Sequence, residues 1–456
     1  MLEEGVMTGK ERVLGTLVGD DVDGVPWVPF TGVHAGKLVG YTATEVLQDA
    51  DKLIKALTEA HRDYQPDGMP VIFDLQVEAE ILGCDLLWAD QSPPTVSRHP
   101  LAEDRTVPKI YPEPTDGRLP IILDAMKRFS EQVGSDTALF GLVCGPFTLA
   151  SHLRGTEIFL DMMDDPGYVK QLIAYCSEVN IRVAGFYADA GMDVLASVDP
   201  LVSQISEDHF REFLFQPSER TFDAYRQMGK SASLFVCGDA TRSIRAMCET
   251  KPDALFVDEN VDLKAAKQIA QDLDVVIGGN LPLSSVMLLG SQNDNMQCVL
   301  DEMETVGTDG LVVAPGCDMP YDTPAENVVG VMQAIRDPES AKQILATAEA
   351  VTETAALDVV AVDYGSLSHP MIEVFTLDSA SCPACSYMMY AVNAAKEELG
   401  DSVEVAEYKI VERENLARAQ MMQIKNLPCV LINGELVFSS LIPNHAELLS
   451  EIEARR

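Results

Sequence analysis

The sequence predicts an α/β protein with a (β/α)8 barrel over residues 1–340 and a second, smaller α/β domain near its end. Two observations support this fold class. Strand-like and helix-like segments alternate through the first region, and the order of elements changes near residue 369. A doubly wound open sheet is the alternative for the first region. No glycine-rich phosphate-binding segment opens its first unit, which counts against a dinucleotide-binding fold.

Eight short apolar runs have the length of buried strands, and helical patterns lie between them. The expected strands are Pro26–Thr31, Met69–Asp74, Leu139–Cys144, Asp193–Val198, Ser233–Cys237, Ala254–Asp258, Asp274–Gly278 and Gly310–Ala314. The expected helices include Ala43–Tyr64, Ile121–Gln132, Pro166–Ala190, Glu207–Met228 and Leu263–Leu273.

Polar residues and cysteines recur where these strands end. They are Asp74, Asp199, Cys237, Asp258, Asn280 and Cys317. In a barrel these ends converge on one mouth, where active sites lie. Each of these residues alone could be a loop cap or a turn former, so the prediction rests on their joint occurrence. The two cysteines could hold a soft metal together, or could be two unrelated buried thiols.

Charge and composition exclude some classes of partner. The net charge of −39 disfavours binding to nucleic acid or to an anionic membrane surface. No apolar run reaches the roughly 18 residues of a membrane span, and the first residues lack the features of a signal peptide. We therefore expect a cytoplasmic protein, in which ten cysteines do not form a disulfide framework.

Residues 341–368 are expected to form a helix and a linker, and residues 369–456 a separate domain. Its expected elements are a strand at Met371–Thr376, a helix that reaches Leu399, a strand at Val403–Ile410, a helix at Glu412–Gln423, a hairpin of Cys429–Ile432 with Leu436–Phe438, and a last helix.

A Cys-Pro-Ala-Cys motif, Cys382 to Cys385, opens the first helix of this domain. Between a strand and a helix, this spacing is typical of thiol redox sites. The helix N-terminus favours the thiolate of Cys382, so Cys382 is the expected nucleophile and Cys385 its resolving partner. The element order, with Pro428 before the hairpin, resembles the thioredoxin/glutaredoxin fold. That resemblance implies a cis Pro428 facing the pair and a thiol reductant as a partner.

One departure from the thioredoxin pattern and two alternative roles remain for this domain. Ser381 stands where thioredoxins usually have tryptophan, so the identity of the reductant or substrate is open. The two cysteines could instead bind metal, for which Cys429 and His369 are the available further ligands. A docking domain without redox activity is the third possibility.

Several barrel segments together resemble the uroporphyrinogen decarboxylase superfamily over about residues 7–336. They are Gly141–Ala150, Ile205–Phe210, Phe256–Leu263, Gly278–Asn280, Val313–Pro320 and Thr323–Asn327. Decarboxylases of this superfamily grip substrate carboxylates with arginines after a Pro-x-Trp motif, whereas Pro26–Gly32 contains none. Decarboxylase activity is therefore disfavoured.

The segment around Cys317 resembles the methylcobamide:thiol methyltransferases, including those that act on coenzyme M. This branch binds zinc through a His-x-Cys pair and a later cysteine. The resemblance implies zinc at Cys237 and Cys317, a zinc-held thiolate as methyl acceptor, and a corrinoid carried by a partner protein. Phe235 stands at the position of the family histidine. Asp199, Cys144 or Glu259 could replace it.

These observations predict a corrinoid-dependent methyltransferase that moves methyl between a methylcorrinoid partner and a small thiol or similar acceptor. We expect Asp199 to be catalytic, and Asp74, Asp258 and Asn280 to bind cofactor. The alternative is a corrinoid- or tetrapyrrole-binding redox protein, in which the Cys-Pro-Ala-Cys domain supplies electrons and the barrel transfers no methyl group.

Overall fold

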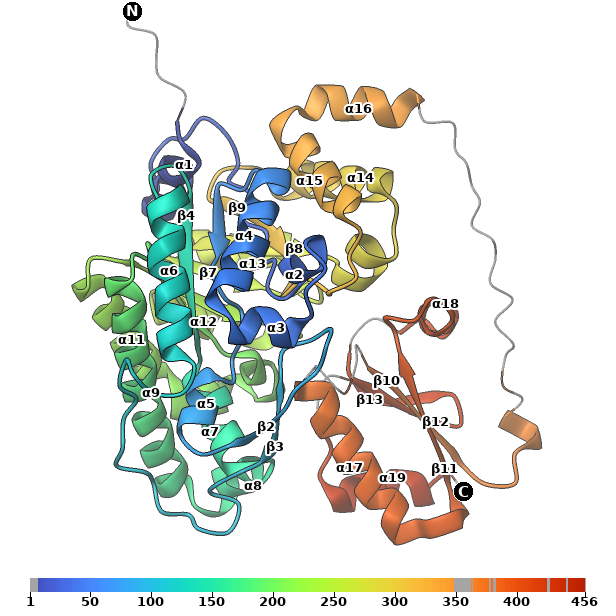
Figure 1. Ribbon diagram of the computed structural model, residues 1–456. Coiled ribbons are helices and arrows are strands. Elements are labelled where there is room, and N and C mark those ends of the chain that lie inside the picture. The colour runs from blue at the N-terminus through green and yellow to red at the C-terminus, as the bar shows by residue number, and fades with distance from the viewer. Residues whose placement is uncertain are drawn as a thin grey trace, which may run out of the picture. The chain divides into compact units, whose positions relative to one another are not determined.

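The computed structural model describes residues 7–347, 362, 364–376, 379, 383–424, 427–439 and 442–455. The chain forms two compact units, one made of most of residues 1–345 and one made mainly of residues 346–456 (Figure 1). Each unit has its own sheet. Within the described residues, no helix is both long and apolar enough to cross a membrane.

The first unit is built on a curled, parallel seven-stranded sheet with the order β1-β4-β5-β6-β7-β8-β9. Its strands are β1 (Gly68–Pro70), β4 (Ala138–Cys144), β5 (Val194–Val198), β6 (Ser231–Val236), β7 (Ala254–Val257), β8 (Val276–Leu281) and β9 (Leu311–Pro315). Seven of the eight expected strands are thereby found, with ends shifted by a few residues. The α/β fold is confirmed, and the curled sheet is consistent with a TIM-type barrel.

The segment around Trp27 lies between the two edge strands of this sheet. The Val28 N–H donates to the Val313 carbonyl at 2.9 Å, and the Asp67 N–H donates to the Trp27 carbonyl at 2.9 Å. The expected strand at 26–31 is thus reduced to one parallel bridge, between Trp27 and Val313. Because it bonds to β9 on one side and to the start of β1 on the other, this segment completes a ring.

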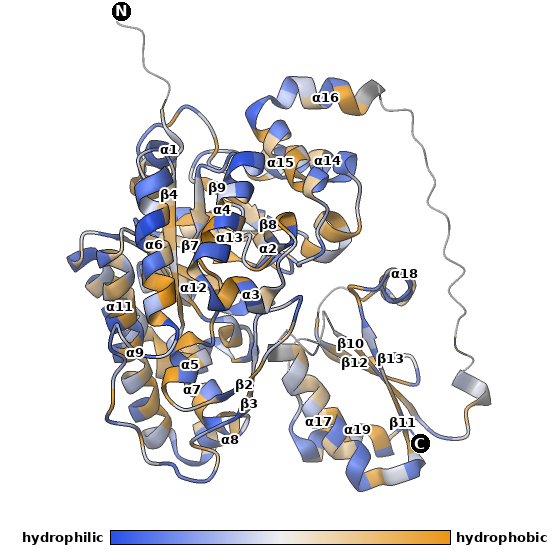
Figure 2. Cartoon of the chain, viewed as in Figure 1, coloured by the Kyte–Doolittle hydropathy of each residue, from blue (hydrophilic) through white to orange (hydrophobic). Residues whose placement is uncertain are grey.

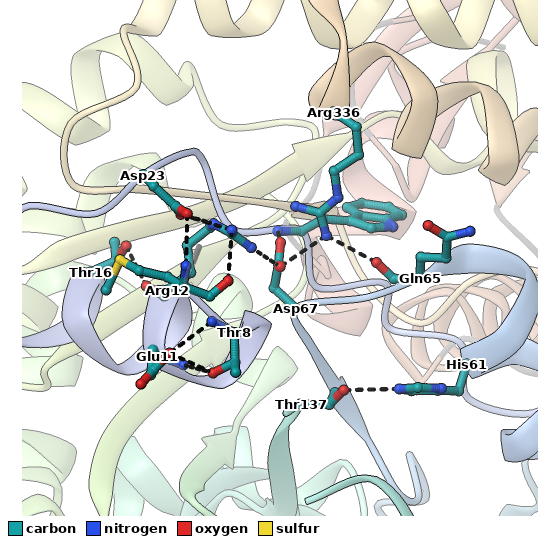
Figure 3. A network of polar contacts seen from close by, with 12 residues as sticks. Thr8, Glu11, Arg12, Thr16, Asp23, His61, Gln65, Asp67, Thr137 and Arg336 are labelled. Atoms are coloured by element: carbon teal, nitrogen blue, oxygen red, sulfur yellow. Dashed lines mark hydrogen bonds and ion pairs between the residues drawn. The ribbon is translucent and has the colours of Figure 1, made fainter. Parts of the chain in front are cut away.

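A buried carboxylate fixes this closure. Asp67 accepts a hydrogen bond from the Trp27 N–H at 2.8 Å and pairs with Arg336 at 2.9 Å and with Arg12 (Figure 3). Arg12 also binds Asp23. The side chain of Asp67 is only 1% exposed, so its charge is stabilised mainly by these two guanidinium groups. The network ties the helix that carries Arg12 and the helix that ends at Arg336 to the ring.

Aromatic rings pack against one another in the space that the curled sheet encloses. The rings in mutual contact are Phe30, Phe73, Phe140, Phe235 and Phe256. Gly278 lies opposite Phe256 in the β7–β8 register, and a Cβ at that glycine would come within 2.2 Å of the Phe256 ring. The glycine therefore leaves the space that the ring occupies.

Helices lie around the sheet and bury their apolar faces, as the two sides of α6 illustrate (Figure 2). They are α1 (Gly9–Val18), α2 (His34–Leu38), α3 (Ala43–Gln48), α4 (Ala50–Tyr64), α5 (Val77–Ile81), α6 (Leu119–Val133), α7 (Pro146–Arg154), α8 (Glu157–Asp164), α9 (Pro166–Asp189), α10 (Glu207–His209), α11 (Phe215–Gln227), α12 (Ile244–Glu249), α13 (Leu263–Gln271), α14 (Gln292–Val306), α15 (Ala325–Arg336) and α16 (Pro338–Thr347).

Besides the expected strand at 26–31, three features of this unit differ from the sequence-based expectation. The helix expected over 43–64 is divided at Asp49, whose side chain caps α4. The helix expected over 207–228 contains a π-helical turn, η2 (Phe210–Leu214). A small hairpin of β2 (Asp85–Leu87) and β3 (Thr95–Arg98) was not expected, because its strands carry exposed, mixed side chains rather than an apolar run.

Among its described residues, the second unit has a four-stranded sheet and three α-helices. Its elements follow in the order β10 (Met371–Thr376), α17 (Pro383–Leu399), β11 (Glu404–Lys409), α18 (Arg413–Met421), β12 (Cys429–Ile432), β13 (Glu435–Ser439) and α19 (His445–Glu453). The sheet order is β11-β10-β12-β13, with β10 parallel to β11 and antiparallel to β12. Every element expected in this region is present.

Candidate active site at the barrel mouth

The two cysteines singled out in the sequence meet at the carboxyl ends of the strands. Cys237 directly follows β6, and Cys317 comes two residues after β9. Their Cα atoms are 5.8 Å apart and their sulfur atoms are bonded to each other. Two strands, β7 and β8, lie between β6 and β9 in the sheet, so the bond joins loops across the mouth. The expected proximity of the two thiols is confirmed, whereas a role as metal ligands stays a prediction.

The end of β7 places two carboxyl groups beside these loops. Burial raises the pKa of Asp258, while hydrogen bonds from the Gly238 and Asn260 N–H groups act in the opposite direction. Glu259 packs against Gly316, where a Cβ would lie 2.8 Å from the Glu259 nitrogen and 3.4 Å from its Oε2 atom. Asp258 thus adjoins the residue after Cys237, and Glu259 the residue before Cys317.

Glu259 has a raised pKa. Burial, the larger effect, and the charge of Asp258 together raise the pKa of Glu259 to about 8. The hydrogen bond that the Leu283 N–H donates to the Glu259 carboxylate acts in the opposite direction and lowers this pKa. The neighbouring strand adds Asn280, whose amide donates to the carbonyls of Asp258 and Val261 at 2.7 and 2.8 Å. The structure therefore brings Asp258 and Asn280 together, although their binding of a cofactor stays a prediction.

Asp199 is engaged as a helix cap. Its carboxylate accepts hydrogen bonds from the Phe147 N–H at 2.9 Å, the Thr148 N–H at 2.8 Å and the Thr148 hydroxyl at 2.6 Å. These donors form the first turn of α7. Burial nevertheless raises the pKa of Asp199 to about 6. The contacts account for this residue as an anchor between β5 and α7, so its expected catalytic role stays a prediction.

Asp74 belongs to a buried charge cluster after β1. Arg118 donates to Asp74 at 2.6 Å and to Glu80 at 2.7 Å, and its guanidinium lies over the Trp88 ring. Glu78 is buried beside them and accepts from the Cys144 N–H at 3.2 Å. Burial raises the pKa of Glu78 to about 7. Asp74 is thus paired with an arginine, and its expected contact with a cofactor stays a prediction.

Three carboxyl groups of the first unit were not singled out from the sequence. Asp318 follows Cys317 and lies against Gly32, and burial raises its pKa well above the usual range. Burial also raises the pKa of Glu302, to about 8, and Glu78 is the third. Of these three, only Asp318 could have been identified from the sequence, because it stands next to Cys317 in the same segment.

The residues near the cysteine pair do not fit a three-ligand zinc site. In the part of the chain that the structure describes, no group of three or more His, Cys, Asp or Glu side chains is arranged to hold a metal ion. Phe235, at the position of the family histidine, is fully buried with its ring 4.7 Å from that of Phe30. The proposed substitutes Asp199 and Cys144 are buried, and Asp199 already binds three donors.

In the second unit, Cys385 is buried in the first turn of α17, and Pro428 directly precedes β12. The Leu427–Pro428 peptide bond is cis, as the resemblance implied. Cys382 and Ser381 lie outside the described residues, so the geometry of the cysteine pair is not tested. Cys429 is buried, which raises its pKa to about 12, and His369 is exposed.

The first unit is similar to proteins of a known family. The family model for uroporphyrinogen decarboxylase (URO-D) matches residues 8–338. The chain belongs to this family. Within it, the similarity is greater to methyltransferases than to decarboxylases. A uroporphyrinogen decarboxylase of Nostoc punctiforme is 23% identical over 295 residues, covering 63% of this chain and 82% of its own length.

The methyltransferase relatives match over nearly their whole length. The methylcobamide:CoM methyltransferase MtbA of Methanosarcina acetivorans is 28% identical over 338 residues, covering 72% of this chain and 98% of MtbA. MtaA of Methanosarcina barkeri is 28% identical over 357 residues, with 72% and 97% covered. A solved methyltransferase from Methanosarcina mazei superposes with a TM-score of 0.67 at 27% identity, covering 73% of this chain and 99% of that one. The URO-D match ends before the second unit begins.

Proposed function

We propose that this URO-D family protein transfers a methyl group from a methylcorrinoid, carried by a partner protein, to the sulfur of a small thiol. The observation that carries this proposal is the likeness to MtbA and MtaA over 98% and 97% of their lengths. A cytoplasmic location goes with this proposal. Zinc, which the resemblance implies as the activator of the acceptor thiol, stays a prediction, and no step below depends on it.

The reaction is a displacement at the methyl carbon. The acceptor thiolate forms a carbon–sulfur bond, and the cobalt–carbon bond breaks with its electron pair going to cobalt. The proton of the acceptor thiol must go to a base at the mouth. We assign that role to Glu259, because it adjoins Gly316 and its pKa of about 8 is close to that of a thiol.

The test uses the full chain without oxygen, with methylcobalamin as the methyl donor and 2-mercaptoethanesulfonate or 2-mercaptoethanol as acceptors. We expect thiol-dependent loss of methylcobalamin absorbance and formation of the matching methyl thioether, identified by mass spectrometry. The Glu259→Gln variant should lower the rate while the Glu304→Gln variant, altered at an exposed glutamate of α14, should not. A folded protein that produces no thioether with either thiol contradicts the proposal.

A redox protein is the second candidate, favoured by the bonded sulfurs of Cys237 and Cys317. In that case the barrel would bind a corrinoid without transferring methyl. The same assay separates the two functions. Reduction of cob(III)alamin by the dithiol-treated protein, with no thioether formed from methylcobalamin, supports the second candidate.

We also propose that the second unit is a thioredoxin-like thiol–disulfide domain, with Cys382 as the nucleophile and Cys385 as the resolving thiol. The strand order β11-β10-β12-β13, the helix after β10 and the position of Cys385 in its first turn support this assignment. Limited alkylation near neutral pH should label Cys382 before Cys385. Mild oxidation should remove two hydrogens from the peptide that contains both. Equal labelling of the two thiols and no internal disulfide would contradict it.

A further inference from the structure

The barrel mouth carries a pair of sulfurs whose chemistry the methyl transfer does not use. Cys237 and Cys317 are bonded to each other and partly exposed. The free cysteines described in the barrel unit differ from this pair. Cys84, Cys144, Cys176 and Cys248 are buried and Cys298 is partly buried, and burial raises the pKa of each of them.

This difference decides which sulfurs can react. A thiol reacts as its thiolate, so a cysteine with a raised pKa and no solvent access is inert near neutral pH. Cys298 is the instructive case, because it is partly exposed and yet its pKa is raised to about 12. Within the described part of the barrel unit, Cys237 and Cys317 are therefore the two sulfurs open to exchange.

The loops that carry the pair are held independently of the sulfur–sulfur bond. The Gly316 N–H donates to the Leu281 carbonyl, at the end of β8, at 3.0 Å. The Met319 N–H donates to the Phe30 carbonyl at 3.0 Å. On the other side, the Gly238 N–H is hydrogen-bonded to Asp258, at the end of β7. Opening the bond thus leaves both loops attached to the sheet, and the two thiols stay near each other.

We propose that Cys237 and Cys317 are a redox-active dithiol–disulfide site at the barrel mouth, with small or protein-borne dithiols as its substrates. One thiolate of the dithiol attacks the sulfur of Cys237 or Cys317 and forms a mixed disulfide. Its second thiol then displaces the cysteine. The dithiol leaves as a disulfide, and its two electrons and two protons remain on Cys237 and Cys317 as thiols.

This site is distinct from a structural staple and from a metal site. A staple resists reduction until the protein unfolds, whereas exchange here needs no unfolding because the loops keep their hydrogen bonds. A metal site would keep both sulfurs as thiolates, for which the described side chains supply no third ligand. The sulfur exchange does not depend on methyl transfer, so the two proposals fail separately.

The test follows both thiols in the folded, full-length protein. The protein is equilibrated without oxygen in graded mixtures of reduced and oxidised dithiothreitol, quenched with N-ethylmaleimide and digested. Mass spectrometry then measures labelling of the Cys237 and Cys317 peptides. We expect both peptides to change from unlabelled to fully labelled at one common ratio, since one two-electron step opens the bond. Cys237→Ser should leave Cys317 labelled at every ratio, and Cys298→Ser, the control, should not alter the transition.

Three results would overturn the proposal. Labelling that begins only after urea unfolds the barrel would make the bond a structural staple. Labelling of both peptides at every ratio would mean that no disulfide forms. One zinc per chain in protein purified without oxygen, lost in Cys237→Ser and protecting both thiols from the maleimide, would make the pair a metal site.

Discussion

Replacing Phe235 by histidine tests how the barrel interior and the mouth are related. Phe235 lies in β6, and Cys237 directly follows that strand two residues later. The Phe235 ring is fully buried, with ring centroids of Phe30, Phe73 and Phe256 at 4.7, 5.8 and 5.7 Å. We therefore expect Phe235→His to destabilise the barrel rather than to build a metal ligand.

The expected loss has two parts. The smaller, polar imidazole forfeits apolar burial worth about 1–2 kcal/mol. Its ring nitrogens find no donor or acceptor among phenylalanine rings, which costs a further 1–3 kcal/mol, about that of an unsatisfied buried polar group. We expect the free energy of unfolding to fall by about 2–5 kcal/mol. Phe235→Leu keeps the site apolar and should cost about 1 kcal/mol.

Tryptophan fluorescence isolates the barrel in this measurement. The two tryptophans of the chain are Trp27, at the closure of the ring, and Trp88, over Arg118. A urea titration followed by their emission therefore reports the first unit alone. A histidine variant as stable as the leucine variant would refute the reasoning. So would a variant that zinc stabilises selectively, because the imidazole would then reach a metal beside Cys237.

Three further changes test other parts of the barrel. Asp67→Asn should lower its stability by about 3 kcal/mol in the same titration, because Arg12 loses its buried partner and keeps only the more exposed Asp23; an unchanged midpoint would contradict this. Burial raises the pKa of Glu78 to about 7 from its ordinary 4.5, so the folded form binds the proton more tightly and stability falls as pH rises between these values. Glu78→Gln should remove that fall, on the order of 3 kcal/mol when pH 5 and pH 8 are compared, and equal pH slopes would count against it. Asp199→Ala should cost about 1–2 kcal/mol, since α7 loses its cap, and a smaller loss would contradict this capping role.

The sequence predicted seven of the barrel strands because each contains a buried apolar run. The sequence also predicted that Cys237 and Cys317 lie close together, because the carboxyl ends of all parallel barrel strands lie at the same face. The hairpin of β2 and β3 was not predicted, because exposed strands lack that apolar pattern. The π-helical turn at Phe210–Leu214 was not predicted either, because no amino-acid composition distinguishes such a turn from an ordinary α-helix.

The chemical state of the site was harder to predict than its position. Two neighbouring cysteines can form a disulfide or can bind a metal with a third side chain as a further ligand. Phe235 stands where the resemblance places a histidine ligand, and this replacement alone does not indicate which of the two states the cysteine pair adopts. Glu78, Glu259 and Glu302 acquire their raised pKa values from burial in loops and helices, which periodicity does not report. The sequence also identified Asp199 as a mouth residue without showing that α7 occupies its carboxylate.

The closure at Trp27 sets an order of events for folding. Its hydrogen bonds join the beginning of the barrel sequence to β9, the last strand of that unit. Contacts between segments so far apart in the chain form slowly, because a long loop must close before they stabilise anything. During synthesis, the edges of β1 and β9 cannot be joined until nearly the whole first unit has left the ribosome. In chains that end just before residue 311, β9 is missing, so the Trp27 segment and the edge of β8 that β9 would cover are both open to pairing with another chain, and we expect these chains to aggregate most.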